Sequence, residues 1–491
     1  MPRQYIADII PSSEITKWKP GDRILITSQT GSGKSQWVKD QLYNYCKDSG
    51  KKILLLSNRS ILRDQNKTEI EAEGKEDVIT LKNYQTLESS VNYGADLDNL
   101  FTGFDFVVYD EVHYIFSDSQ FNGNTDILMS PILYSVGNRI FIFITATPQA
   151  VKTYASKYEY EYTIKTDYSY IENMFYYYKD ETAENILHTI PDNEKAIYFG
   201  NAKRSLELSQ EFNNAAFLCS EYGDYERHSS RKVKSQIVEN NRFDCQYLFS
   251  TKVLDNGINI IMPELKHIFI AMVDPIDVIQ CLGRKRVFDN DKINLYIKDA
   301  RGNQIVPLLR RMRNKLNFVK EQNELGPSAF LEKYARIPFD DIIMHNGQVN
   351  GAKLIYSKYI IDIFSKMFSD KDKKGFQTYI NRVLFQNPSK VKDAELCYEQ
   401  KSIETILQSY LGKRLYKEDI EIFKNIFFQN IFAPKRKIDI RKRGKKCINS
   451  ILSEDNLFYR IDSRTETGNG HRNETVWKVV PWDEKEGGED D

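Results

Sequence analysis

Short apolar runs alternate with amphipathic stretches over the first 300 residues of the chain. Runs that are almost continuously apolar are typical of parallel strands buried on both faces, and helical spacing between them is typical of helices that cover the sheet. The pattern predicts eight strands, at residues 23–27, 52–56, 106–109, 140–145, 196–199, 247–250, 267–271 and 294–297. Eight strands over this length fit two α/β lobes better than one, at residues 1–166 and 167–300.

The pattern changes after residue 300. Apolar residues recur at helical spacing at 305–325, 353–368, 375–386 and 419–432, which predicts a helical accessory domain over residues 301–432. Residues 433–482 begin with a basic segment, followed by a helix at 444–452 and two strands at 457–462 and 474–480. Helix, strand, turn and strand in that order resemble the back half of a winged-helix domain. The acidic residues 483–491 are expected to form a disordered tail.

Nine tyrosines fall between residues 154 and 178. Aromatic rings can stack on nucleic-acid bases. An alternating strand packed at the junction of the two lobes is the simpler interpretation, and we favour it.

Composition narrows the class of protein. The formal net charge is zero, so a nucleic-acid binder of this kind must concentrate its basic residues locally. The six cysteines lie far apart and none has C-x-x-C spacing, which favours free thiols in a reducing compartment. No signal-like segment opens the chain, and its apolar runs are far shorter than the roughly 20 residues of a membrane span. We therefore expect a cytoplasmic protein that does not enter a membrane.

A glycine-rich turn follows the first predicted strand, where residues 28–35 read SQTGSGKS, and a helix is expected at 36–47. This order is what a phosphate-binding loop requires, because backbone N–H groups and the helix N-terminus then point into one anion-binding concavity. Lys34 is expected to reach the β and γ phosphates of ATP, and Ser35 to ligate Mg²⁺. The consensus begins with glycine, where this chain has Ser28. The expected nucleotide-binding residues of the loop are Thr30, Gly31, Ser32, Gly33, Lys34 and Ser35.

Two acidic residues end the strand of residues 106–109, which continues as Asp110-Glu111-Val112-His113. A carboxylate at the carboxyl edge of such a strand lies beside the phosphate loop in folds of this class. We expect Asp110 to hold Mg²⁺ and Glu111 to polarise the attacking water. On its own this tetrapeptide is a weak signal, but it is a strong one at about 75 residues after a phosphate loop.

The same tetrapeptide resembles motif II of the superfamily-two DExH helicases, and further segments follow in that family's order. Residues 57–59 and 80–87 are similar to two strand-gripping segments, and 145–148 (TATP) to motif III. Residues 196–201, 249–260 and 280–286 (QCLGRKR) resemble motifs IV, V and VI. The resemblance covers roughly residues 20–300 and implies two RecA-like lobes that clamp one ATP between them.

The resemblance also implies roles for individual residues. Gln280, Arg284 and Arg286 would act on the γ-phosphate from the second lobe. Lobe closure would be relayed by Asp255 and Gly257, and hydrolysis would be coupled to movement through His113, Thr145 and Thr147. The family places its second motif-VI arginine three positions after the first. Here it follows after two, as in some viral origin-binding helicases, so which arginine contacts the γ-phosphate stays open.

Nucleic acid is the expected partner. The family resemblance implies backbone contacts from Ser57, Asn58, Arg59 and Thr251, and the basic C-terminal segment predicts further phosphate contacts from Arg441, Lys442, Arg443, Lys445, Lys446, Arg464 and Arg472. The sequence thus predicts an ATP-dependent helicase or translocase, with DNA favoured over RNA by the winged-helix resemblance. Three alternatives stay open: an RNA helicase, a sequence-specific origin-binding replication initiator, and a translocase subunit of a defence complex.

Overall fold

The computed structural model describes residues 4–29, 32–57, 67, 69–134, 137–154, 157–165, 167–220, 224–252, 259–288, 291–369, 375–384, 390–431, 443–468 and 471–482. The chain forms two compact units. The core unit comprises Met1–Met174 and Ile190–Lys390, and the C-terminal unit comprises Phe175–Thr189 and Val391–Asp491. None of the described helices is long and apolar enough to cross a membrane.

The first lobe is built on a six-stranded sheet in the order β3-β2-β4-β5-β1-β6. All five neighbouring strand pairs in it are parallel, so the carboxyl ends of its strands meet at one edge. Its strands are β1 (Arg23–Thr27), β2 (Ile53–Ser57), β3 (Ile79–Asn83), β4 (Phe106–Asp110), β5 (Ile140–Thr145) and β6 (Tyr160–Thr163).

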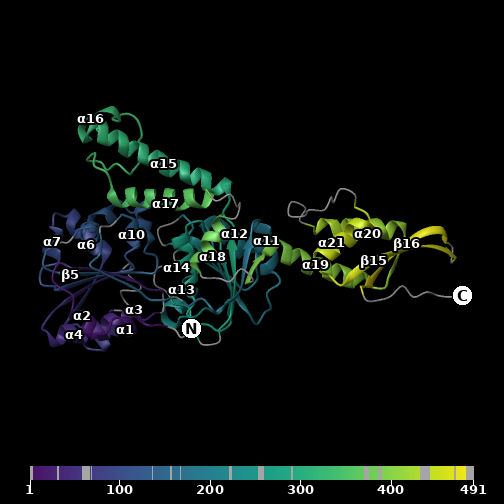
Figure 1. Ribbon diagram of the computed structural model, residues 1–491, viewed down its shortest axis with the longest axis horizontal. Helices are drawn as coiled ribbons and strands as arrows, with labels where there is room; N and C mark the ends of the chain where they lie inside the picture. Colours follow the sequence, from purple (N-terminus) through teal and green to yellow (C-terminus); the bar gives the residue numbers. More distant parts are fainter. Residues whose placement is uncertain are drawn as a thin grey trace. The chain divides into compact units, whose positions relative to one another are not determined.

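Helices cover both faces of this sheet (Figure 1). On one face lie α1 (Ile6–Ile9), α2 (Ser12–Ile15), α3 (Lys34–Trp37) and α4 (Tyr43–Asp48), and a π-helical stretch, Val38–Leu42, joins the last two. On the other lie α6 (Tyr84–Asn92), α7 (Leu97–Leu100) and α10 (Gln149–Tyr154). The remaining short helices are α8 (Tyr114–Ser117), η2 (Asp118–Gln120), η3 (Gly123–Leu128) and α9 (Ser130–Leu133). Burial on both faces explains why β1, β4 and β5 are apolar along almost their whole length.

The second lobe has a seven-stranded sheet in the order β13-β7-β12-β11-β8-β10-β9. Its strands are β7 (Ile171–Tyr177), β8 (Lys195–Phe199), β9 (Ala215–Leu218), β10 (Tyr247–Ser250), β11 (Leu265–Ile270), β12 (Ile293–Lys298) and β13 (Val391–Asp393). Its helices are α11 (Asp180–Leu187), α12 (Ala202–Glu211), η4 (Glu226–His228), α13 (Arg231–Asn240) and α14 (Pro275–Leu282). The expected pair of RecA-like α/β lobes is confirmed.

A helical segment follows β12 directly. It consists of α15 (Gly302–Leu325), α16 (Pro327–Lys333), α17 (Gly351–Ser369) and α18 (Gly375–Val383). The long helices α15 and α17 lie side by side, with α16 at the turn between them (Figure 1). Val319 and Phe330 pack with Ile342 and Ile343 in a small core of this segment.

The C-terminal unit contains α19 (Ala394–Tyr410), β14 (Arg414–Leu415), α20 (Lys417–Gln429), α21 (Lys445–Glu454), β15 (Tyr459–Gly468) and β16 (His471–Pro481). The last two strands form an antiparallel hairpin, and the sheet order is β14-β16-β15. The helix, strand, turn and strand expected over residues 444–480 are present as α21, β15 and β16. The tail at 483–491 lies outside the described residues.

The division expected near residue 432 does not match the packing. Helices α19 and α20 were expected to belong to the helical accessory domain, but they share one apolar core with α21 and the C-terminal sheet. That core includes Ile403, Phe423, Phe427, Ile448 and Val479. Helical periodicity predicted α20, at residues 419–432, but not α19. A local pattern also does not say against which partner an apolar face packs.

Candidate active site

The phosphate loop connects β1 to α3 at the carboxyl edge of the first sheet. The backbone N–H of Ser28 donates to the carbonyl of Thr145 at 2.9 Å, so the loop leaves the sheet beside the end of β5. The hydroxyls of Ser28 and Ser32 are hydrogen-bonded, and Ser32 Oγ also donates to the Gln29 carbonyl at 2.6 Å. Gly33 caps α3 at φ 82°, a left-handed conformation that favours glycine. Thr30 and Gly31 lie outside the described residues.

Lys34 and Ser35 occupy the first turn of α3. Lys34 is buried, and its Nζ forms an ion pair with Glu111 Oε1. Ser35 is half-buried beside it. The loop, the helix start and the acidic pair, which are widely separated in the sequence, therefore meet at one point.

Glu111 adopts a left-handed backbone conformation, with φ 52°. For a residue with a side chain this conformation costs about 1–2 kcal/mol. It turns the carboxylate of Glu111 back toward Lys34. Burial alone would raise the pKa of Glu111, but the positive field of Lys34 and the contact with His113 outweigh burial and hold the pKa below its usual range. Glu111 is therefore a carboxylate at neutral pH, as a residue that polarises water must be.

Asp110 ends β4 next to this ion pair. Burial raises the pKa of Asp110 to about 6, and the field of Lys34 opposes that rise. Its Oδ1 is buried and has no hydrogen-bond partner among the described residues. A buried, unpaired carboxylate oxygen of Asp110 and the hydroxyl of Ser35 in the first turn of α3 are hard oxygen ligands of the kind that Mg²⁺ prefers. These residues fit the expected ion.

His113, Thr145 and Thr147 form a buried polar cluster behind the acidic pair. His113 Nδ1 lies 3.4 Å from Glu111 Oε2 and 3.1 Å from Thr145 Oγ1. Thr145 Oγ1 in turn accepts from the backbone N–H of Thr147 at 3.0 Å. The acidic pair that ends β4 is thus connected to the end of β5.

Tyr84 was not singled out from the sequence. It begins α6 and donates from its hydroxyl to the carbonyl oxygen of Asp110 at 2.7 Å. Its ring stacks on Tyr114, with centroids 5.4 Å apart. Tyr84 lies within the expected strand-gripping segment at 80–87, so it links that segment to the acidic pair. A tyrosine at a helix start carries no local signal for such a contact.

The strand of the phosphate loop and the strand of the acidic pair are separated by one strand, β5, which ends in the Thr-Ala-Thr-Pro segment. Three motifs that are distant in sequence therefore share one edge. This is the arrangement that the resemblance to superfamily-two helicases predicts. A second α/β lobe follows in the same chain, and the expected motif VI segment begins in the last turn of its helix α14.

Comparison with known proteins gives distant likenesses. Neither a protein-family model nor a curated protein matches the chain. A solved structure of S. cerevisiae Dbp5 bound to RNA and ADP BeF3 has 16% identity and a TM-score of 0.41, covering 56% of this chain and 78% of that one. The helicase MrfA bound to DNA and AMPPNP has 17% identity and a TM-score of 0.43, covering 63% of this chain and 50% of that one. Mss116p bound to single-stranded RNA and AMP-PNP has 12% identity and a TM-score of 0.40, covering 86% and 87%. We therefore infer a function only from the residues of this chain.

The motif VI residues form their own network in the second lobe. Gln280, on α14, is buried, and its Oε1 accepts from Arg284 Nη2 at 2.9 Å. Arg284 is also buried, and its Nε donates to the Gln280 carbonyl at 3.0 Å. Arg286 Nε donates to Asn259 Oδ1 at 2.6 Å. Asp255 and Gly257 lie outside the described residues.

The expected nucleic-acid contacts are only partly described. Thr251 is half-buried at the end of β10. In the C-terminal unit, Lys446 is exposed, Lys445 Nζ donates to Ser463 Oγ at 2.7 Å, and Arg464 pairs with Glu466 at 2.9 Å. Arg443 is exposed just before α21. Asn58, Arg59, Arg441 and Lys442 lie outside the described residues, as does the side chain of Arg472.

The expected contact of Ser57 with a nucleic-acid backbone does not agree with the burial of this residue. It ends β2 and is 1% exposed, so its side chain has no surface to offer a nucleic-acid strand. The sequence pattern correctly predicted the buried strand β2 but counted its last residue as part of the contact surface.

The tyrosine-rich stretch is mainly packing, as favoured from the sequence. Tyr158, Tyr168, Tyr176 and Tyr177 are all buried. Buried rings cannot stack on the bases of a nucleic acid.

Proposed function

We propose that this protein is a superfamily-two motor that couples ATP hydrolysis to movement on, or unwinding of, nucleic acid. The observation that carries the proposal is the convergence of Lys34, Asp110 and Glu111 at the carboxyl edge of one parallel sheet. These are the groups that a phosphoryl-transfer site needs: a cation for the phosphates, a carboxylate for the metal and a carboxylate for water.

In the proposed reaction, the loop backbone and Lys34 hold the triphosphate, displacing the ion pair between Lys34 and Glu111. Asp110 and Ser35 would hold Mg²⁺, which would supply positive charge to neutralise the phosphates. Glu111, freed from Lys34, orients the water that attacks the γ-phosphorus.

From the second lobe, Arg284 and Arg286 stabilise charge on the phosphoryl group in transfer, and Gln280 holds Arg284 in place. Arginine fingers of this kind contribute about 10³–10⁵ in rate. The roles of Asp255 and Gly257 in relaying closure remain a proposal from the motif resemblance alone.

Coupling to nucleic acid would run through two contacts of the acidic pair. His113 connects Glu111 to Thr145, and Tyr84 connects Asp110 to the segment at 80–87. A strand held by that segment, by Asn58 and Arg59, and by Thr251 of the second lobe would bias the two lobes toward closure.

DNA is proposed as the preferred nucleic acid, because α21, β15 and β16 resemble the back half of a winged-helix domain and a basic segment, residues 435–446, leads into them. Arg443, Lys445, Lys446 and Arg464 would contact phosphates, together with Arg441, Lys442 and Arg472. An RNA helicase, an origin-binding initiator and a defence translocase are alternatives that one set of assays separates.

The test is ATP hydrolysis by the full chain with single-stranded DNA, single-stranded RNA or duplex DNA, each at matched nucleotide concentration. The proposal predicts stimulation by DNA above that by RNA. Stronger stimulation by RNA would support the RNA helicase. Site-selective footprints on random duplexes would support the initiator, and stimulated hydrolysis without strand displacement would support the translocase. Absence of hydrolysis with every substrate would contradict the proposed motor.

A further inference from the structure

Helix α17 contacts both lobes of the core unit. It packs on α8, η2 and η3, the segment of the first lobe that directly follows His113. It also reaches α14, the second-lobe helix that carries Gln280 and leads to Arg284. No functional role for this helical segment was predicted from the sequence.

The contact with the first lobe is made at the N-terminus of α17. Asn350 Nδ2 donates to the Gly123 carbonyl at 2.7 Å, and the backbone N–H of Ala352 donates to Asp126 Oδ1 at 3.0 Å. A carboxylate of the first lobe thus caps a helix of another segment, where the positive end of the helix dipole favours it. A Cβ at Gly351 would lie 2.9 Å from Asp126 Oδ1, so a side chain at this position would displace the capping carboxylate.

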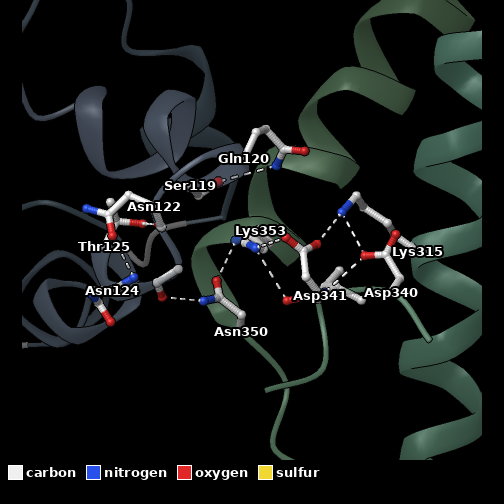
Figure 2. A network of polar contacts seen from close by, with 12 residues as sticks. Ser119, Gln120, Asn122, Asn124, Thr125, Lys315, Asp340, Asp341, Asn350 and Lys353 are labelled. Atoms are coloured by element: carbon white, nitrogen blue, oxygen red, sulfur yellow. Dashed lines mark hydrogen bonds and ion pairs between the residues drawn. The ribbon is translucent and has the colours of Figure 1, made fainter. Parts of the chain in front are cut away.

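The N-terminal half of α17 is held rigidly to α15. Lys353 is buried, and its Nζ pairs with Asp341. Lys315 of α15 pairs with Asp340 at 2.7 Å and with Asp341 at 2.9 Å (Figure 2). Asn350 Oδ1 accepts from the Lys353 N–H at 2.9 Å, which joins this network to the first-lobe contact (Figure 2).

The contact with the second lobe lies one helical turn further on. Tyr356 donates from its hydroxyl to Asp274 Oδ2 at 2.6 Å, and Asp274 Oδ1 accepts from the Ile276 N–H at 2.9 Å as the N-cap of α14. Ala352 and Tyr356 are four residues apart, about 6 Å along one face of the helix. One rigid turn of α17 therefore separates a first-lobe contact from a second-lobe contact.

A second contact supports the same connection. Lys252 of the second lobe lies 3.9 Å from Asp277, in the first turn of α14, and its Nζ lies 4.9 Å from the ring centroid of Phe121 in the first lobe. The start of α14 is thus connected to the segment after His113 by two routes, through the side chain of Lys252 and through α17.

We propose that α17 sets the position of α14 relative to the first lobe, and that Tyr356 is a positioning residue for Gln280 and Arg284. This inference depends on the proposed ATPase function only for its predicted effect on kcat. The predicted anchoring of α14 does not depend on that function. Tyr356 acts through the Asp274 cap of the helix that carries Gln280.

The test compares Tyr356→Phe with Tyr359→Phe in the full chain. Tyr359 lies on the same helix and is buried, and its hydroxyl donates to no other described residue, so the control removes one buried hydroxyl without breaking a described hydrogen bond. Amide hydrogen exchange of α14 reports its anchoring without any need for activity. We expect exchange in Tyr356→Phe to be faster by on the order of 10-fold, the change that loss of one hydrogen bond produces, and Tyr359→Phe to match the wild type.

Kinetics give the second readout. Tyr356→Phe is expected to lower kcat by about 10-fold to 100-fold, as misplacement of a catalytic group does, with little change in the KM for ATP. Gly351→Ala, which disturbs the first-lobe end of α17, should likewise lower kcat with little change in the KM for ATP. Equal exchange of α14 in wild type and Tyr356→Phe would overturn the proposal, as would a changed KM at unchanged kcat. If the wild-type protein did not hydrolyse ATP, the proposed function would be contradicted. The hydrogen-exchange comparison would still test the positioning role of Tyr356.

Discussion

The imidazole Nδ1 of His113 lies 3.1 Å from the hydroxyl oxygen of Thr145, and this contact joins the ends of two neighbouring parallel strands. One strand carries the acidic pair and the other begins the Thr-Ala-Thr-Pro segment. The cluster is buried, so a change at either end reaches the other without competition from solvent.

Replacement of His113 by alanine should weaken the coupling between nucleic acid and hydrolysis. We expect the ratio of stimulated to basal ATPase rates to fall by about 2-fold to 30-fold, equivalent to about 0.5–2 kcal/mol of coupling free energy. His113→Gln retains a hydrogen-bonding side chain and should recover part of the ratio. The measurement is steady-state hydrolysis over a titration of nucleic acid, and an unchanged ratio in both variants would exclude the coupling role.

Loss of Lys34 should destabilise the protein as well as inactivate it. Lys34→Met leaves Glu111 as a buried charge without its ion-pair partner, which costs up to about 3 kcal/mol. Adding Glu111→Gln removes the unpaired charge, so thermal unfolding of the double variant should recover toward the wild type while hydrolysis stays absent. If the two changes lowered stability additively, the ion pair would have no energetic role.

Asp274 predicts a pH dependence of stability. Burial, reinforced by the nearby Asp277, raises the pKa of Asp274 to about 7 in the folded protein, above its usual value of 3.8. The folded state then holds more protons than the unfolded state between these values, so the contribution of Asp274 is full below pH 4 and is lost as pH rises through 7. Asp274→Asn keeps the N-cap, and the stability of this variant relative to wild type should rise from pH 4 to pH 7. If the difference in the free energy of unfolding between Asp274→Asn and the wild type stayed constant from pH 4 to pH 7, the raised pKa of Asp274 would be contradicted.

The C-terminal unit should contribute salt-sensitive binding. Lys446→Gln and Arg464→Gln each remove one proposed phosphate contact, and each should reduce the slope of log K against log salt by about 0.9 on duplex DNA. Lys424→Gln is the matched control, because Lys424 pairs with Glu421 at 2.7 Å on α20 of the same unit. Fluorescence anisotropy with a labelled duplex measures the slopes. If all three variants had the same slope of log K against log salt, Lys446 and Arg464 would not contact the nucleic acid.

The sequence predicted the central strands well and the edge strands poorly. Strands β1, β4 and β5 lie inside the first sheet and are covered on both faces, so they read as continuous apolar runs. Strands β3 and β6 form the two edges of that sheet, and β9 forms an edge of the second. Their partly exposed or short sequences lack such runs. The apolar runs did not identify β3 or β9, and β6 was anticipated only through the alternating pattern of the tyrosine-rich stretch.

Within the site, the sequence predicted which segments meet but not how individual side chains connect. The proximity of Lys34 to the acidic pair follows from parallel strands that share one edge. The contacts of Tyr84 with Asp110 and of Tyr356 with Asp274 join residues 26 and 82 positions apart, and no local pattern encodes them. The roles proposed for the motif residues remain predictions that the variants above test.

The most direct measurement is ATP turnover by the wild type and by Glu111→Gln, with and without single-stranded DNA, beside nucleotide binding by both. The account predicts that DNA stimulates wild-type turnover. It also predicts that Glu111→Gln binds ATP at least as tightly, because Lys34 loses its charged competitor, yet hydrolyses it at least about 100-fold more slowly. Turnover by Glu111→Gln equal to that of the wild type would contradict the assignment of the acidic pair, and with it the proposed motor.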